Sequence, residues 1–388
     1  MTTNKIRDRN NKVPKVLQVL PELNSGGVER GTVDVTEALT EIGWKAIIVS
    51  SGGAMVREVE RAGGLHISLP VNSKNPFVMR QNVKALSNLI RSHNIGLVHA
   101  RSRAPAWTAK VASDKCSVPL VTTFHGTYNY NNAIKKAYNE IMVKGDRVIA
   151  ISKFIGQHIT DHYSPQLDRI RIIPRGVDLD RFNPEAVTAE RMIKLAESWR
   201  LPDGAPVIML PGRLTRWKGQ SVLIEAAKRL KRQDIRVLLV GEEQGRSAYR
   251  TKLEEQISRI GAEGIIHLTG PCSDMPAAYM LADVVISAST DPEAFGRVAA
   301  EAHAMGRPVI ASDHGGARET VIAGETGWLV PPGDSDAIAQ ALRTALAMTK
   351  DEREKVAQRA MKHVTENFNK TQMCQATLNV YNELIHQK

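Results

Sequence analysis

Short apolar runs alternate along the chain with longer stretches whose apolar residues recur every three or four positions. The longer stretches, such as residues 28–39 and 77–92, have the spacing of amphipathic helices. The short runs are bounded by glycine, proline or polar residues, which predicts buried strands. In the first half they lie at residues 16–20, 45–50, 65–69, 95–99, 120–123, 148–152 and 171–173. Strands that alternate with helices in this way predict a doubly wound parallel sheet.

The second half repeats this alternation without repeating the sequence. Its predicted strands lie at residues 206–210, 237–240, 265–268, 283–288 and 308–311, with an edge strand within 324–332. A polar, proline-containing stretch at residues 183–206 separates the two halves and marks a domain boundary. We therefore predict an α/β protein with two Rossmann-like domains, residues 1–186 and 187–366, followed by a helical segment at 367–388.

Charge narrows the class of partner. The chain has 52 Lys and Arg residues against 41 Asp and Glu, a net charge of +11, which implies an anionic partner. A nucleic acid, an acidic lipid or a phosphorylated substrate would satisfy this charge. Only 5% of the residues are aromatic, and no zinc-finger or RNA-binding signature accompanies the charge, so we expect no nucleic acid.

Cysteine usage and hydropathy indicate a compartment. The three cysteines lie far apart without metal-ligand spacing, which predicts a reduced, cytoplasmic protein with no metal site. No apolar run approaches the roughly 20 residues that a membrane helix requires. Residues 1–12 lack the hydrophobic core of a signal peptide, so neither a membrane span nor secretion is expected.

The richest stretch for chemistry begins at the predicted strand 283–288. A turn containing Glu293 follows, and a helix is predicted at residues 295–305, with Glu301 about one and a half turns in. In an open α/β sheet such loops line the ligand crevice, and free amides at a helix start attract anions. The two carboxylates suit vicinal hydroxyls of a sugar or ribose. The alternative is that Glu293 merely favours a helix N-terminus and Glu301 is solvated.

Two cations follow the first strand of the second half. Arg213 ends the strand and Lys218 enters the next helix, which places both at the crevice. A departing nucleoside diphosphate develops negative charge, and such cations can neutralise it without a metal ion. The alternative is that both side chains are solvated surface cations.

The first half has glycine and histidine loops after its strands. Gly26 and Gly27 follow strand 16–20, but the full dinucleotide fingerprint is missing, so NAD binding is disfavoured. His125 follows strand 120–123 in a loop that should face the same crevice, and it is either a site residue or a packed structural residue. His99, Arg101 and Arg103 are candidates for an anionic acceptor, because a guanidinium fits phosphate or carboxylate; the alternative is a solvated basic loop.

A basic amphipathic segment at residues 133–143 carries Lys135 and Lys136, with Lys144 and Arg147 nearby. It would rest on an anionic membrane face or be an ordinary surface helix.

Several of these motifs resemble the retaining family 4 glycosyltransferases of the GT-B fold. The resemblance rests on Glu293 and Glu301 with seven residues between them, Phe295 and Gly296 after the first, and the Gly315-Gly316 pair downstream. The segments 211–219 and 174–182 and the Gly26-Gly27 loop extend it over nearly the whole chain. Arg175 departs from the family pattern, in which Asn is commoner.

The resemblance implies that two Rossmann-like domains face each other across a cleft and that segment 367–388 crosses back to the first. It implies transfer of a hexose from a GDP- or UDP-sugar to a glycan or glycolipid, with retention and without a bound metal or other cofactor. Lipopolysaccharide core or other envelope polysaccharide synthesis would be the pathway. The implied donor contacts are Gly26, Gly27, His125, Arg213, Lys218, Leu268, Glu293, Phe295, Gly296, Arg297 and Glu301. Of these, His125, Arg213, Lys218 and Glu293 would be catalytic.

Two other classes of function stay open. One is a nucleotide-sugar epimerase or hydrolase on the same fold, which needs an acid/base set on the sugar. The other is a non-enzymatic binder of anionic glycan or lipid, supported by charge alone.

Overall fold

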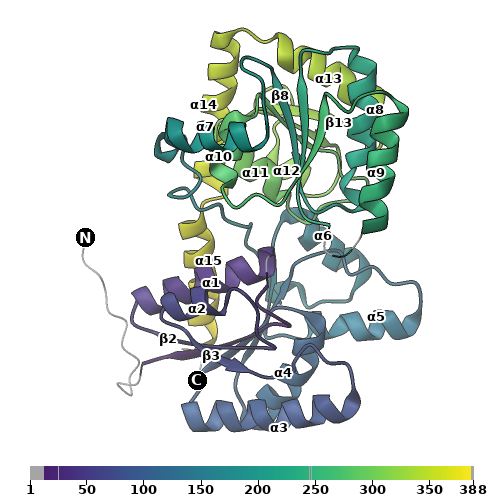
Figure 1. The fold of residues 1–388 in the computed structure, drawn as a ribbon. Helices are drawn as coiled ribbons and strands as arrows, with labels where there is room; N and C mark the ends of the chain where they lie inside the picture. Colours follow the sequence, from purple (N-terminus) through teal and green to yellow (C-terminus); the bar gives the residue numbers. More distant parts are fainter. Residues whose placement is uncertain (1–12, 25, 244, 246, 386–388) are drawn as a thin grey trace. The chain divides into compact units, whose positions relative to one another are not determined.

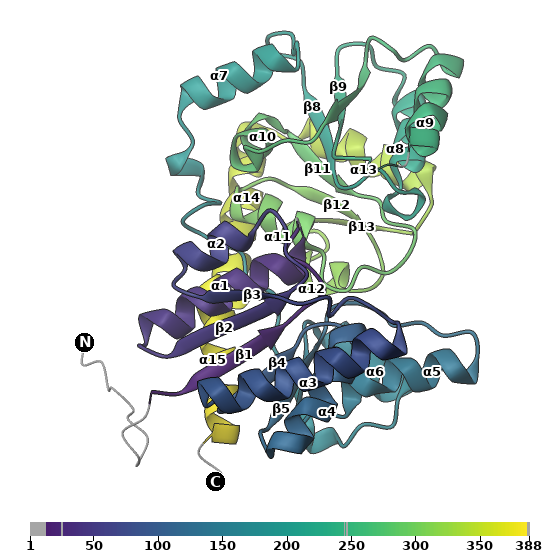
Figure 2. The ribbon, with the colours of Figure 1, turned by 60° about the horizontal axis from the view of Figure 1, so that its bottom comes forward.

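The computed structural model describes residues 13–24, 26–243, 245 and 247–385, and the chain forms two compact units. Unit 1 is Met1–Arg175 with Lys370–Lys388, and unit 2 is Gly176–Asn369. The sequence predicts these boundaries at 186/187 and 366/367. Each unit holds one parallel sheet with helices, as Figures 1 and 2 show, which confirms the predicted fold class. The absence of a secretory signal was inferred from residues 1–12, which lie outside the described residues.

Unit 1 contains a seven-stranded sheet with the order β3-β2-β1-β4-β5-β6-β7. Its strands are β1 (Lys15–Val19), β2 (Lys45–Ser50), β3 (Leu65–Ser68), β4 (Leu97–Ala100), β5 (Leu120–Phe124), β6 (Arg147–Ala150) and β7 (Ile170–Ile172). Its helices are α1 (Gly27–Glu41), α2 (Val56–Arg61), α3 (Pro76–His93), α4 (Arg103–Cys116), α5 (Ala133–Glu140), α6 (Lys153–His162) and α15 (Lys370–Ile385). All strand pairs are parallel, and β1 pairs with both β2 and β4.

Helix α15 completes the core of unit 1, although it comes from the end of the chain. Met373, Leu378 and Tyr381 are buried in one cluster with Val16 of β1 and Leu97 of β4. The Tyr381 hydroxyl lies 2.6 Å from Nδ1 of His99. Apolar burial of this kind contributes about 25 cal/mol per Å², so the helix is an integral layer of the unit.

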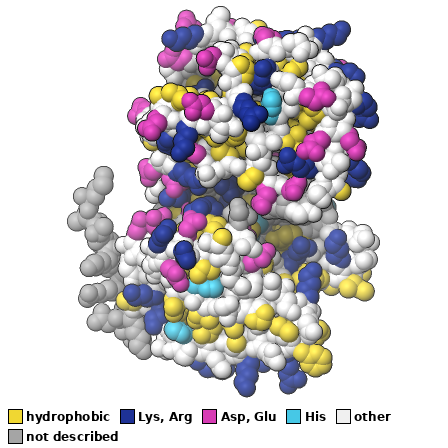
Figure 3. All heavy atoms as spheres, in the orientation of Figure 1, with side chains coloured by type: hydrophobic (Ala, Val, Ile, Leu, Met, Phe, Trp, Pro, Cys, Tyr) yellow, Lys and Arg dark blue, Asp and Glu magenta, His cyan; other side chains and the backbone are white. Residues whose placement is uncertain are grey.

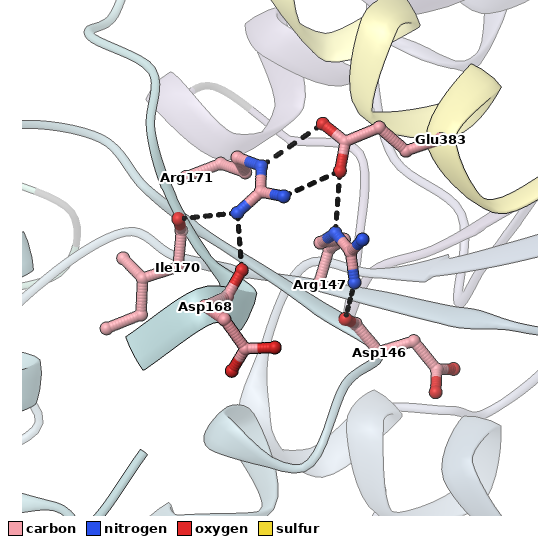
Figure 4. A network of polar contacts seen from close by, with 6 residues as sticks. All are labelled: Asp146, Arg147, Asp168, Ile170, Arg171 and Glu383. Carbon is pink, nitrogen blue, oxygen red and sulfur yellow. Dashed lines mark hydrogen bonds and ion pairs between the residues drawn. The ribbon is translucent and has the colours of Figure 1, made fainter. Parts of the chain in front are cut away.

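A polar network fixes the far end of α15 (Figure 4). Arg147 of β6 donates to Oε2 of Glu383 at 2.7 Å, and Arg171 of β7 donates to the same oxygen at 2.7 Å. Arg171 also donates to Oε1 at 3.1 Å. The Arg171 hydrogen bond lowers the pKa of Glu383 against the opposing effect of burial, with Arg147 adding to the shift. The carboxylate thus bridges α15 to two neighbouring strands.

Unit 2 contains a six-stranded parallel sheet with the order β10-β9-β8-β11-β12-β13. Its strands are β8 (Val207–Pro211), β9 (Arg236–Val240), β10 (Ile266–Gly270), β11 (Val284–Ser287), β12 (Val309–Ser312) and β13 (Gly327–Val330). Its helices are α7 (Ala189–Ser198), α8 (Gln220–Leu230), α9 (Ser247–Arg259), α10 (Met275–Leu281), α11 (Arg297–Ala304), α12 (Ala317–Thr320), α13 (Ser335–Ala347) and α14 (Lys350–Asn367).

Two elements of unit 2 differ from the sequence-based expectation. The polar stretch taken as a boundary contains α7, whose Arg191 forms an ion pair with Asp274 at 2.6 Å. Helix α11 begins at Arg297, not at Phe295 as expected, because Gly296 adopts a left-handed conformation with φ of 89°. Among the described residues, no helix is long and apolar enough to span a membrane.

Candidate functional site

The strand order of unit 2 points to one place for a ligand. The chain enters the sheet at β8, winds outward to β10, and returns to the other side of β8 at β11. Ligands in such sheets bind beyond the carboxyl ends of the strands at this reversal. The loops after β8 and β11 therefore form the candidate site, and they carry Lys218 and Glu293.

Lys218 and Glu293 are in direct contact. The Lys218 ammonium donates to Oε1 of Glu293 at 2.7 Å, and both side chains are largely buried, with exposed fractions of 13% and 12%. The ammonium also lies 4.4 Å from the centre of the Trp217 ring. The hydroxyls of Ser289 and, at 3.4 Å, Ser287 donate to the same Glu293 oxygen. One carboxylate oxygen thus collects an ammonium and two hydroxyls.

These contacts determine the protonation state of Glu293. Burial alone would raise the pKa of this carboxyl, but the Lys218 charge and the Lys218, Ser289 and Ser287 hydrogen bonds outweigh it, so its pKa lies below the usual value. The carboxylate is therefore ionised near neutral pH and accepts hydrogen bonds only.

Backbone contacts hold the two loops together. The amide of Thr290 donates to the carbonyl of Trp217 at 2.7 Å, and the amide of Gly316 donates to the carbonyl of Glu293 at 2.8 Å. Gly219 has φ of 75°, and a Cβ there would lie 1.9 Å from the carbonyl oxygen of Ala288. Only glycine allows this approach, which brings the Lys218 turn against the end of β11.

Arg297 and Glu301 lie on the first turns of α11. Arg297 donates to Oε1 of Glu301 at 2.8 Å, and the Tyr279 hydroxyl donates to Oε2 at 3.0 Å. Glu301 is therefore held on both oxygens rather than simply solvated. Phe295 is 3% exposed and packs edge-on against Phe368, so its side chain belongs to the core, while its backbone borders the site.

The two remaining donor candidates of unit 2 occupy different places. Arg213 is exposed in the loop after β8, and its carbonyl accepts from Gln220 at 2.9 Å. Leu268 lies in β10, the edge strand of the sheet, and packs half-buried against the hydrophobic core.

His125 of unit 1 follows β5 and contacts Arg175. Nη2 of Arg175 donates to Nδ1 of His125 at 2.8 Å. Gly26 and Gly27 lie in the loop after β1 and at the first position of α1, so both loops are at carboxyl ends of strands in the first sheet. This is the arrangement expected of a binding loop.

His99 and Arg101 were expected to face an acceptor, and the structure corrects this. His99 is 1% exposed, and its ring nitrogens contact the hydroxyls of Tyr381 and Thr123, both at 2.6 Å. Arg101 is 3% exposed and donates through Nε to Gln18 Oε1 at 2.9 Å. Both residues are therefore part of the interior of unit 1.

Arg103 is better placed for a ligand. It is half-buried, donates to Oδ1 of Asn139 at 2.8 Å, and its guanidinium carbon lies 4.4 Å from the centre of the Tyr128 ring. Stacking and one hydrogen bond hold the guanidinium plane in a defined direction.

Sequence reasoning missed the residues that support the pair. Ser287, Ser289 and Tyr279 contact the two glutamates, and Arg175 contacts His125. For the serines a signal existed, because Ser287 ends β11 and Ser289 lies two positions later, in the loop that leads to Glu293. Tyr279 lies 22 positions before Glu301, and periodicity carries no information at that separation.

Two known protein families match the chain, one in each half. Residues 192–363 match the family described as "Glycosyl transferases group 1", and residues 25–181 match "Glycosyltransferase Family 4". The crystal structure of a glycosyltransferase from Rickettsia africae is 39% identical, with a TM-score of 0.91, and the match covers 97% of this chain and 100% of that one.

Two further proteins are similar. The D-inositol 3-phosphate glycosyltransferase of Xylanimonas cellulosilytica is 31% identical over 65% of this chain, and the match spans 63% of its own length. Anabaena HepE, solved with UDP and glucose, has a TM-score of 0.84 at 23% identity, with 96% of this chain and 100% of that chain covered, and shares the fold. These matches, together with the two parallel sheets, show that the chain belongs to the GT-B glycosyltransferases of the family 4 type.

Proposed function

We propose that the chain transfers a hexose from a nucleotide diphosphate sugar to a hydroxyl group of an acceptor. The observation that carries this proposal is the Lys218–Glu293 pair at the reversal point of the second sheet. In this pair, a cation that would bind a diphosphate lies beside an ionised carboxylate that would bind sugar hydroxyls. Membership of the glycosyltransferase family supports the same assignment.

In the proposed reaction, Arg213, Lys218 and the amides at the start of α11 neutralise the leaving diphosphate. Each hydrogen bond to a charged group is worth about 1.5–3 kcal/mol, so this set supplies several kcal/mol of transition-state stabilisation. Lys218 has three donor hydrogens, so it can keep Glu293 while it binds a phosphate oxygen.

Glu293 would accept hydrogen bonds from donor-sugar hydroxyls and Glu301 from the ribose, with Leu268 near the base. On the sugar side, His125 and the Gly26-Gly27 loop of unit 1 would complete the site. The acceptor oxygen attacks the anomeric carbon as the bond to the diphosphate breaks, and the acceptor proton passes to a phosphate oxygen. This front-face displacement retains the anomeric configuration and requires no metal ion.

The acceptor proposed is a glycan or glycolipid of the cell envelope, such as lipopolysaccharide core, with Arg103 as an anion contact. GDP and UDP are both candidate carriers. The protein would act in the cytoplasm. It would contact the inner membrane face with the surface over α3 and α5, where hydrophobic and basic side chains gather (Figure 3). Phe77 and Ile134, at the starts of these helices, are 80% and 84% exposed.

The test is a product assay of the full chain with a panel of UDP- and GDP-sugars, each with and without an envelope glycan acceptor. We expect acceptor-dependent release of the nucleoside diphosphate that continues in a chelator. Glu293→Ala should lower kcat/KM at least 100-fold, roughly the loss of one charged hydrogen-bond set. Glu366→Ala, a change at an exposed carboxylate of α14, is the matched control.

The outcomes separate the alternatives. Release of nucleoside diphosphate without acceptor would indicate a hydrolase, and conversion of the donor into another sugar an epimerase. Near wild-type turnover by the Glu293→Ala variant, or activity that returns from chelation only with manganese, would overturn the assignment.

A further inference from the structure

The contact between Arg175 and His125 defines which imidazole nitrogen carries a proton. Arg175 Nη2 lies 2.8 Å from His125 Nδ1. A guanidinium has donors only and stays protonated, so Nδ1 must be the acceptor. A neutral imidazole has one proton, which must then be on Nε2.

The surroundings of His125 also exclude a second proton. Burial lowers the pKa of His125 well below its ordinary value, and the charges of Arg175 and Arg101, with the ring of His99, lower it further. In the same loop, the Tyr128 ring packs against Phe124 and under the Arg103 guanidinium. Among the described residues, the groups that shift the pKa of His125 are two arginines and a histidine, and none of them is a carboxylate.

The other ring nitrogen of His125, Nε2, is a buried hydrogen-bond donor without an acceptor among the described residues. Buried N–H groups of folded proteins are nearly always paired, and an exception at a candidate site suggests that a ligand supplies the partner.

Helix α1 is shaped to admit the guanidinium. Gly31 lies in the middle of this helix, and a Cβ there would be 2.0 Å from Nη1 of Arg175. Glycine inside a helix is unfavourable, so its place here is explained by the room that Arg175 needs. Gly31, Arg101 and Arg175 line a cavity of about 20 Å³, enough for one water molecule.

We propose that Arg175 is a positioning residue that holds His125 as a neutral imidazole with its one proton on Nε2. This rests on the proposed function for its consequence: His125 acts on the donor sugar as a hydrogen-bond donor to an oxygen, and does not take the acceptor's proton. This proposal gives a specific role to Arg175, at a position where the family more often has Asn.

The first test is ¹⁵N NMR of the histidine rings in the full chain, with His125 assigned by comparison with His125→Gln. We expect the His125 signals of the Nε2–H tautomer, unchanged between about pH 5 and pH 8. In Arg175→Met, which keeps an unbranched side chain without donors, both neutral tautomers should appear, because burial still disfavours the charged ring but no donor selects the tautomer. Arg175→Lys, which restores a donor, should restore the Nε2–H pattern.

The second test is kinetic. Arg175→Met should lower kcat about 10-fold or more, while inhibition by the free nucleoside diphosphate stays within about twofold. Arg175→Lys should recover much of the rate.

The NMR result does not depend on turnover, so failure of the proposed function and failure of this inference are distinguishable. A wild-type His125 that titrates between pH 5 and pH 8, or that carries its proton on Nδ1, would overturn the inference. So would a folded Arg175→Met variant with an unchanged NMR pattern. If that variant does not fold, the spectra of the wild type and of Arg175→Lys still show which nitrogen of His125 carries the proton.

Discussion

At the scale of single residues, the candidate site depends on charges that are buried together. Lys218 and Glu293 are each nearly nine-tenths covered, so removing one leaves the other buried and unpaired. Burial of the two charges costs desolvation free energy, so the pair adds little to stability unless a ligand uses it. Its position at the sheet reversal gives a reason for it to be there.

Lys218→Met should change how the site responds to pH. Without the ammonium, burial dominates and the pKa of Glu293 rises above its wild-type position. Since the carboxylate must be ionised to bind sugar hydroxyls, the acidic limb of the kcat/KM profile should move to higher pH. At neutral pH, kcat/KM should fall about 10- to 150-fold for the lost charged hydrogen bond.

The comparison is a pH–rate profile of the variant and of Lys228→Met, which removes an exposed lysine of α8. The control should keep the wild-type profile. A Lys218→Met variant with the acidic limb at its wild-type position would show that another group keeps Glu293 ionised.

At the scale of elements, α15 is attached to unit 1 by more than apolar packing. Glu383 joins it to β6 and β7 through two arginines, and Tyr381 joins it to His99 of β4. Arg147 is the more buried partner, with a side-chain exposure of 16%. An ion pair that is partly buried is worth more than one in water.

Glu383→Gln should loosen this attachment by about 1–2 kcal/mol, because two arginines lose their shared carboxylate. Hydrogen exchange measured by mass spectrometry should then be faster in α15, β6 and β7, by roughly 5- to 30-fold. Glu366→Gln, in the exposed pair with Lys362, should leave exchange unchanged. Equal protection of α15 in both variants would contradict the expected role of Glu383.

Most elements could be predicted from the sequence, because their patterns are local. The strands were found from short apolar runs, and the parallel sheets follow from alternation with helices. Helix α7 was missed because its segment is polar and flanked by prolines, and its partner Asp274 is far along the chain. The start of α11 was misplaced because the left-handed turn at Gly296 depends on tertiary packing.

The site was predictable in part for the same reason. Lys218 and Glu293 were identified from motifs, but their contact spans 75 positions and only the fold shows it. His99 and Arg101 have the right chemistry at strand ends, yet their side chains turn inward, and position in the sequence cannot decide direction. Arg175 could be identified as unusual, but its partner His125 could not.

At the scale of the whole molecule, the positive charge calls for an anionic surface or ligand. The net charge of +11 exceeds what one diphosphate requires. Around α3 and α5, Lys74 lies 5.9 Å from the Tyr138 ring centre, so the loop before α3 adjoins α5. Phe77 and Ile134 are exposed on these helices, so the surface carries apolar side chains as well as lysines. This combination is typical of peripheral membrane binding.

The full chain should therefore sediment with vesicles that contain phosphatidylglycerol and not with phosphatidylcholine alone. Binding should weaken in about 1 M salt, where the Debye length is about 3 Å. Asp at Phe77 and Ile134 (F77D with I134D) should abolish it, because acidic side chains replace the apolar contacts.

The matched control is Ile193→Asp, at an exposed position of α7 in unit 2. It should bind as the wild type does. Binding that is equal for all three proteins would place the membrane contact elsewhere or show that none exists at this surface.

The late arrival of α15 has a consequence for synthesis. As the chain leaves the ribosome, residues 13–175 emerge first, but the apolar side of their sheet that Met373, Leu378 and Tyr381 cover stays bare. Unit 2 is continuous and can close as soon as residue 369 has cleared the exit tunnel. The first sheet therefore keeps this apolar side uncovered in the nascent chain until α15 has also emerged, and chaperones can bind it in that state.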